Sequence, residues 1–176
     1  EGDWYYDAVQ YVYEKGLMNG TAADEFAPNA TTTRAMVVTI LYRLEGEPSG
    51  GGETPFTDLK AGQYYLDAVA WANANGIVNG TTATTFDPDG AITRQQMAAI
   101  LYRYAAYKGY DVSVSADLSS YPDAGAIQTY AQDAMAWANG SELILGFEDH
   151  TLQPVGNSTR AQVATLLMRF CEGVAK

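Results

Sequence analysis

A threonine-arginine pair opens three separate apolar segments of this chain, and these three copies constrain the fold more than any other feature. The copies begin at Thr33, Thr93 and Thr159. When the pairs are aligned, an aspartate, a glycine and a proline fall into register in every copy without gaps: Asp7, Asp67 and Asp133; Gly20, Gly80 and Gly146; Pro28, Pro88 and Pro154. The chain therefore uses one unit of about 55–60 residues three times.

Each unit is predicted to fold as a helix, a long loop and a second helix. The first helices are expected over 5–14, 65–74 and 131–139. The second helices follow the threonine and carry apolar side chains at i, i+3, i+4 and i+7, as Val37, Ile40, Leu41 and Leu44 do in the first unit. A helical hairpin this short cannot bury its own apolar face, so the units are expected to pack on one another. The predicted fold class is all-α.

The ends of the predicted helices have recognisable capping residues. The three threonines are natural N-caps, and a glutamine three residues later, Gln96 or Gln162, completes a capping box in the second and third units. The first unit has Met36 there and forgoes half of the box. Gly16 and Gly76 supply left-handed C-caps for the first helices. Since Glu142 replaces this glycine in the third unit, we expect that helix to end earlier or differently.

The boundaries of the units follow from two polar segments, 46–52 and 108–120, which contain glycine and serine and are predicted to be flexible linkers. The units are accordingly assigned to 1–46, 54–110 and 119–176 and are expected to form one domain. The first unit lacks the segment that aligns with 56–58 in the second. We therefore expect the chain to be part of a larger protein.

All six arginines lie in the second helices, as pairs nine residues apart: Arg34 and Arg43, Arg94 and Arg103, Arg160 and Arg169. Nine residues turn an α-helix by about 900°, so the members of a pair face opposite sides and cannot share a ligand within one helix. The second members lie near helix C-termini, where a cation is favourable, and a structural role suffices for them. The first members oppose the helix dipole, at a cost of about 0.3–1 kcal/mol each.

Two explanations of the first-turn arginines remain open. A guanidinium beside free first-turn N–H groups would form an anion site, able to hold a carboxylate or phosphate with about 1.5–3 kcal/mol. Alternatively, each arginine makes an ion pair or a carbonyl contact that locks the preceding loop. If the first explanation holds, replacing the arginine by alanine weakens binding and leaves the melting temperature nearly unchanged or slightly higher.

Composition excludes several classes of function. A net charge of −11 argues against a nucleic-acid partner and against binding to an anionic membrane face. Cys171 is the single cysteine and His150 the single histidine, which excludes an internal disulfide and a cysteine zinc site and leaves little scope for general-base chemistry. No apolar run approaches the roughly 20 residues that span a bilayer. We expect no cofactor, no membrane insertion and no catalysis.

The repeated pattern resembles a known domain over nearly the whole chain. The second unit contains Phe56-Thr57-Asp58, Tyr64, Ala68, Gly76, Gly80, Phe86-Asp87-Pro88 and Ile92-Thr93-Arg94. This pattern resembles the S-layer homology domain, of which three tandem copies are usual. The resemblance implies three units with pseudo-threefold symmetry around a central helical bundle. It also implies anchoring of a surface protein to an anionic secondary cell wall polysaccharide that bears pyruvate ketals.

The resemblance also implies site residues, in grooves between the units. The ketal carboxylate would be contacted by the motif arginines, Arg34, Arg94 and Arg160. The sugar would stack on three aromatic side chains, Trp4, Tyr64 and Tyr130. Further polar contacts would come from Asp58 and Asp123. The family's usual glutamate, two residues after the arginine, is absent from all three copies, which have Met36, Gln96 and Gln162 there. Of the three sites, that of the third unit is expected to be the least active, because of Glu142.

Alternatives remain for several of these residues. The three aromatics would equally serve as hydrophobic staples at helix starts. Trp71 and Trp137, at equivalent positions in the first helices, are expected to be core residues. A protein-interaction or self-assembly module with structural arginines is the alternative function.

Overall fold

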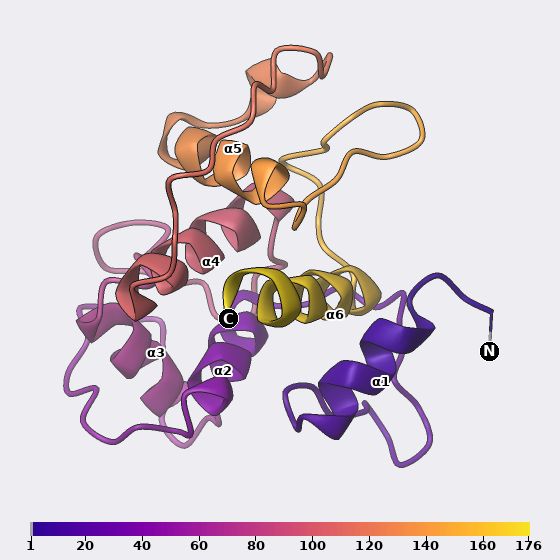
Figure 1. The fold of residues 1–176 in the computed structure, drawn as a ribbon. Coiled ribbons are helices and arrows are strands. Elements are labelled where there is room, and N and C mark those ends of the chain that lie inside the picture. The colour runs from indigo at the N-terminus through magenta and orange to yellow at the C-terminus, as the bar shows by residue number, and fades with distance from the viewer. Residues whose placement is uncertain (1) are drawn as a thin grey trace.

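The computed structural model of the protein describes residues 2–176 and contains helices joined by loops (Figure 1). The α-helices are α1 (Tyr6–Glu14), α2 (Arg34–Leu44), α3 (Leu66–Ala74), α4 (Arg94–Lys108), α5 (Gln132–Gly140) and α6 (Arg160–Arg169). Two 3₁₀ turns, η1 (Ala124–Ala126) and η2 (Thr129–Ala131), precede α5, and a π-helical turn, η3 (Phe170–Val174), extends α6. Residues 2–176 include isolated β-bridges but no strand, which confirms the all-α prediction. Within this range no helix has the length and apolarity needed to cross a bilayer.

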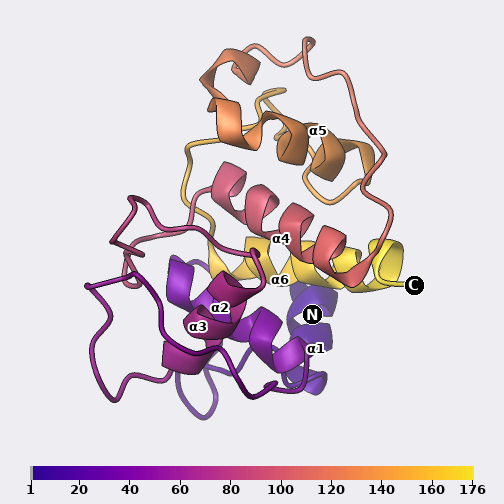
Figure 2. The same cartoon turned by 90° about the vertical axis from the view of Figure 1, so that its left-hand side faces the viewer.

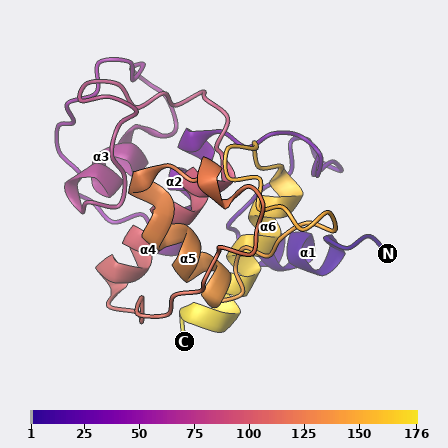
Figure 3. The same cartoon turned by 90° about the horizontal axis from the view of Figure 1, so that it is seen from above.

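The helices pair between units. The first helix of each unit packs on the second helix of another unit: α3 on α2, α5 on α4, and α1 on α6 (Figures 2 and 3). The two helices of one unit therefore pack on two different units. The apolar faces of a unit are both buried only when the other two units are present. This arrangement explains why so short a unit is used three times.

A closed ring of three backbone hydrogen bonds joins the three units. The N–H of Thr32 donates to Ser158 O (3.1 Å), that of Ser158 to Ile92 O (2.8 Å), and that of Ile92 to Thr32 O (2.9 Å). All three residues are buried and each comes from a different unit. The contacts are thus cyclic, while the relation of the units by a threefold axis stays a prediction.

The tryptophans of the first helices are core residues, as predicted. Trp71 is 3% exposed and Trp137 is 1% exposed. Each ring packs on a tyrosine of the helix that its own helix contacts: Tyr42 of α2 at 5.7 Å and Tyr102 of α4 at 5.5 Å between ring centroids. These aromatic pairs fix the α2–α3 and α4–α5 contacts.

The threonine caps form as predicted, but the expectation for the end of α5 was wrong. The Thr93 and Thr159 capping boxes are complete, and Thr33 caps without a box. Helix α5 has nine residues, as α1 and α3 do. Glu142 adopts the left-handed conformation with φ of 60°, close to that of Gly76 at 69°. The following residue explains this, because Leu143 N–H donates to Ala138 O at 2.8 Å and closes the same turn.

The two linker segments lie against the helices that follow them rather than forming free connections. Gly51 approaches α3 so closely that a Cβ there would be 2.4 Å from the backbone nitrogen of Trp71. In the second linker Asp111 O accepts from the Trp137 indole at 3.3 Å, and Ala116 N–H donates to Ala136 O at 3.0 Å. Flexibility was predicted from composition, but tertiary contacts override it.

Candidate functional site

Each motif arginine holds the loop of another unit through backbone carbonyls. Arg34 donates from Nε to Phe86 O at 2.8 Å and from Nη2 to Asn79 O at 3.2 Å, and its guanidinium lies 4.8 Å from the Phe86 ring centroid. Arg94 and Arg160 repeat the pattern, the first with Leu152 O and Leu145 O, the second with Phe26 O and Asn19 O. The explanation that each arginine makes a carbonyl contact that locks a loop is therefore confirmed. The loop, however, belongs to a different unit and not to the arginine's own.

The first turns of the motif helices are not anion sites. The Arg34 N–H donates to Gly90 O at 2.9 Å, the Ala35 N–H to Pro88 O at 3.1 Å, and the Met36 N–H to the Thr33 hydroxyl at 3.2 Å. The equivalent amides of α4 and α6 are occupied in the same way. Since carbonyls of the neighbouring loop already use these donors, an anion would have to be held by side chains.

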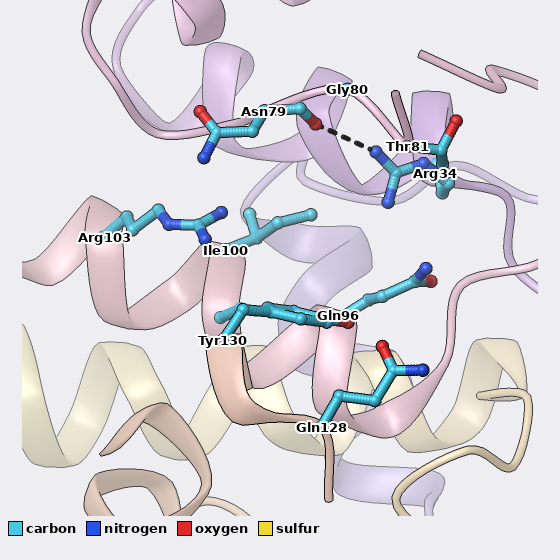
Figure 4. A pocket seen from close by; sticks show the side chains of 10 residues that line it. Arg34, Asn79, Gly80, Thr81, Gln96, Ile100, Arg103, Gln128 and Tyr130 are labelled. Atoms are coloured by element: carbon cyan, nitrogen blue, oxygen red, sulfur yellow. Dashed lines mark hydrogen bonds between the residues drawn. The ribbon is translucent and has the colours of Figure 1, made fainter. Parts of the chain in front are cut away.

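Three grooves contain the motif arginines, and each groove is built from all three units. One unit supplies the motif arginine, a second supplies its loop and second helix, and the third supplies an aromatic residue. The Arg34 groove has a volume of about 400 Å³ and is lined by Arg34, Gln96, Ile100, Arg103 and Tyr130 (Figure 4). The Arg94 groove, of about 860 Å³, is lined by Arg94, Gln162, Leu166, Arg169 and Trp4. The Arg160 groove, of about 220 Å³, is lined by Arg160, Met36, Ile40, Arg43 and Tyr64.

The second arginine of each groove was missed as a site residue. Arg103, Arg169 and Arg43 were given only a role at helix C-termini. The structure places each of them opposite the motif arginine of another unit, and Figure 4 shows Arg34 and Arg103 extending into one groove from different sides. The nine-residue spacing does separate the arginines of one helix. The cyclic arrangement of the units then brings arginines of different helices together.

The Arg34 and Arg94 grooves each contain two positively charged guanidinium groups that are partly buried. Burial lowers the pKa of Arg34, Asp87 opposes this, and the nearby Arg103 lowers it further. Burial lowers the pKa of Arg94 to about 10, with Asp123 opposing and Arg169 adding to the effect. Two guanidinium groups that repel each other in a partly buried groove favour an anion between them.

The three predicted aromatics lie on the groove walls and are largely exposed. Trp4 is 67% exposed, Tyr64 58% and Tyr130 48%. A staple at a helix start would be buried against its own helix, so these side chains are poorly placed for that role. Burial raises the pKa of the Tyr130 phenol, and both Arg34 and Arg103 lower it, which indicates that the phenol lies near both guanidinium groups. Sugar stacking on these rings stays a prediction.

The two predicted aspartates brace the loops instead of lining a groove. Asp58 accepts from the N–H groups of Phe86 at 2.9 Å and Asp87 at 2.7 Å. Asp123 accepts in the same way from Leu152 at 2.9 Å and Gln153 at 2.7 Å. Neither carboxylate lines any of the three grooves. These contacts hold the loop whose carbonyls accept from the motif arginine, and a polar contact of either aspartate with a ligand stays a prediction.

The Asp58→Asn substitution is expected to destabilise the protein by about 1–3 kcal/mol, because an amide oxygen accepts more weakly from two backbone donors. Burial raises the pKa of Asp58, but the bonds from Phe86 and Asp87 lower it more, so the net direction is downward. A lowered carboxyl pKa gives stability that is present above the unfolded-state value near 4 and is lost as the pH falls below it. Urea titrations at pH 7 and pH 3 should therefore show a smaller pH effect in the variant. Asp89→Asn, at a side chain that is 73% exposed, is the control and should change little.

The sequence matches the S-layer homology domain family over residues 1–35, 55–98 and 120–164. It is 35% identical over 98% of its length to an endoglucanase of Bacillus sp. (strain KSM-635), of which it covers 18%. It is 32% identical over 96% of its length to the surface-layer 125 kDa protein of Lysinibacillus sphaericus, of which it covers 14%. It is 31% identical over 60% of its length to the S-layer protein sap of Bacillus anthracis, covering 12% of it. The chain thus spans less than a fifth of each relative. With a match in each of its three repeats, this chain belongs to the S-layer homology domain family.

Proposed function

We propose that the chain is a non-covalent anchor that holds a larger surface protein on the bacterial cell wall by binding an anionic, pyruvylated secondary cell wall polysaccharide in its grooves. The observation that carries the proposal is the pairing of two arginines from different units beside an exposed aromatic side chain. Family membership and the surface-layer relatives support a cell-surface location and an anchoring role.

The Arg34 groove suits a sugar that carries a carboxylate. A pyruvate ketal places one carboxylate at the edge of a sugar ring. The guanidinium of Arg103 has no hydrogen-bond partner among residues 2–176, so its N–H groups are available to that carboxylate. The Tyr130 ring offers an apolar face for the sugar, and the Gln96 amide offers donors and acceptors for hydroxyls. A volume of about 400 Å³ lies within the range of about 300–1,000 Å³ typical of small-molecule sites.

We expect the three grooves to differ in affinity. The Arg94 groove repeats the features of the Arg34 groove with Gln162, Arg169 and Trp4. The Arg160 groove is the smallest, and Met36 stands where the others have glutamine, so it lacks a polar group for sugar hydroxyls. We therefore propose the Arg160 groove as the weakest site. The loop of the third unit, which contains Glu142, contributes to the larger Arg94 groove. The presence of Glu142 is therefore no reason to expect a weak site.

The proposed role is non-catalytic. The aspartates that would be candidates for acid-base chemistry, Asp58 and Asp123, are engaged by backbone amides away from the grooves. Binding of a carboxylate by guanidinium groups needs no bond cleavage. The endoglucanase named above shares only its matching region with this chain, and its enzymatic name describes a protein more than five times as long.

Sedimentation with bacterial cell wall sacculi tests the proposal. The purified chain is expected to co-sediment with sacculi that retain their polysaccharide, and binding should weaken as the ionic strength rises because the contact joins opposite charges. Selective removal of pyruvate should abolish most of the binding. Sacculi stripped of the whole polysaccharide provide the background value.

Binding that is unchanged after removal of pyruvate and after removal of the whole polysaccharide would contradict the anchor proposal. It would favour the alternative of a protein-interaction module. In that case the chain should instead associate with itself or with a purified surface-layer protein in the absence of any wall material. Sedimentation velocity of the chain alone and in such a mixture distinguishes these outcomes.

A further inference from the structure

Gln128 gives the Arg34 groove a polar side chain that has no counterpart in the other two grooves. It lies two residues before Tyr130, and both side chains line the groove (Figure 4). Glycine stands two residues before the aromatic side chain in the other two units, as Gly62 and Gly2. The other two grooves therefore have no side chain at this position.

The backbone of Gln128 is fixed on both sides. The neighbouring Ile127 is 7% exposed, and Ala131 is completely buried. The Gln128 carbonyl accepts from the Ala131 N–H at 2.9 Å, and the Gln128 N–H donates to the side-chain oxygen of Gln95 at 2.9 Å. Both backbone polar groups of Gln128 are thus bonded, which holds the residue in an extended conformation with φ of −69° and ψ of 149°.

Gln95 makes this contact from the first turn of α4, one residue after the motif arginine. Its side chain is only 3% exposed. The equivalent residues of the first and third units are Ala35 and Ala161, whose side chains contain no acceptor. In the second unit the N–H of Gly62 has no acceptor among residues 2–176, and Gly62 has a left-handed φ of 77°. The position of Gln128 is therefore set by a side chain that the other units lack.

The Gln128 amide is available to a ligand to a greater extent than the other glutamine of the groove. The side-chain oxygen of Gln96 already accepts from the Thr93 N–H at 3.0 Å in the capping box. The side chain of Gln128 is exposed and has no hydrogen-bond partner within residues 2–176. A sugar hydroxyl both donates and accepts, so it can bond to the oxygen or to the NH₂ group of this amide.

We propose that Gln128 determines specificity in the Arg34 groove, where its amide bonds to a ring hydroxyl of the pyruvylated sugar that lies on Tyr130. Gln95 is a positioning residue that acts through Gln128. This inference rests on the proposed function, in which Arg103 binds the ketal carboxylate of the same sugar. Because the other two grooves have glycine at this position, only the Arg34 groove distinguishes sugars by this hydroxyl through residue 128.

A methyl glycoside of a hexose that carries a pyruvate ketal tests the proposal, together with analogues that each lack one of its free hydroxyls. Ala99 lines the Arg34 groove and neither of the other two, so its amide signal in nuclear magnetic resonance spectra reports binding to this groove. One analogue is expected to bind the parent chain about threefold to tenfold more weakly, the loss typical of one hydrogen bond. Gln128→Ala should show the same loss with the full sugar and should not distinguish it from that analogue.

Two variants of Gln95 test its positioning role. Gln95→Met has nearly the same length but no oxygen acceptor, so it should weaken binding of the full sugar about threefold or more. The Gln128 amide should also exchange faster with solvent in this variant, which is measured without a ligand. Gln95→Glu keeps an acceptor in the first turn of α4, where the helix dipole favours a carboxylate, and should retain most of the affinity. Gln132→Ala, at an exposed glutamine outside the three grooves, is the matched control and should bind as the parent does.

The specificity role of Gln128 is overturned if Gln128→Ala binds the full sugar as the parent does, or if loss of a hydroxyl weakens the parent and this variant equally. The positioning role of Gln95 is overturned if Gln95→Met binds as the parent does, or if Gln95→Glu binds as weakly as Gln95→Met. These results differ from a failure of the proposed function, in which the parent chain binds none of the sugars and this inference fails with it.

Discussion

Replacing Arg34 by alanine is expected to lower the free energy of unfolding by about 3–5 kcal/mol. Arg34 is only 5% exposed, and its Nε and Nη2 donate to two carbonyls of another unit. The substitution leaves both carbonyl oxygens in a partly buried position without their donors, and each costs about 1–3 kcal/mol. Urea denaturation followed by circular dichroism measures the effect. This expectation reverses the one drawn from the sequence, in which the melting temperature hardly changed.

The matched control is Arg103→Ala, which removes the same charge from the same groove. The Arg103 side chain is half-buried and has no hydrogen bond to another of residues 2–176, so its loss should cost about 1 kcal/mol or less. If Arg34→Ala is as stable as the parent, the carbonyl contacts are not what holds the loop. The arginine would then be free for a ligand, as the sequence alone suggested.

The same Arg103→Ala variant is expected to weaken binding to the pyruvylated polysaccharide about 10–100-fold while leaving the fold intact. A charge-assisted hydrogen bond to a carboxylate contributes about 1.5–3 kcal/mol, and each 1.4 kcal/mol corresponds to a factor of ten in affinity. Calorimetry with a pyruvylated sugar fragment measures the loss directly. Because Arg34 already donates to two carbonyls, we expect Arg103 to make the main contact with the ligand. Its counterpart Arg169 makes one long contact, from Nη1 to Leu143 O at 3.4 Å, and is expected to do the same in the Arg94 groove.

Arg43→Ala tests whether the effect is specific to a groove. Arg43 lines the smallest groove, where Met36 replaces the glutamine, so its loss should change the total binding least. Arg103→Lys keeps the charge but loses the planar guanidinium group, so its affinity for the polysaccharide should lie between those of the parent and the alanine variant. Equal losses from Arg43→Ala and Arg103→Ala would contradict the proposed ranking of the grooves. No loss from any of the second arginines would contradict the ligand role of Arg103.

The tertiary structure shows the motif arginine in contact with backbone carbonyls, whereas its position in the sequence suggested a ligand role. The first-turn amides of α2 looked free because nothing local in the sequence caps them. They are occupied by Gly90 O and Pro88 O, which lie more than 50 residues away along the chain. The dipole cost of an arginine at this position is offset by two hydrogen bonds to carbonyls of another unit, a benefit that no local rule can detect.

Several features could be predicted from the sequence because they depend on near neighbours in the chain. The threonine caps, the capping boxes at Gln96 and Gln162, the helical stripes and the burial of Trp71 and Trp137 all follow from local patterns, and the structure has them. The prediction for Glu142 failed because a non-glycine residue can take the left-handed conformation when the following turn is fixed by hydrogen bonds.

The repeat, the helix positions and the family were determined by the sequence itself, since periodicity and capping are properties of residues a few positions apart. Only the tertiary structure decided which helices pair, which loop each arginine holds, and that Arg34 and Arg103 share a groove with Tyr130. These facts depend on how three nearly identical units close into a cycle. Three similar units can in principle pair within themselves or with either neighbour, and the choice rests on the sum of many packing contacts rather than on any one motif.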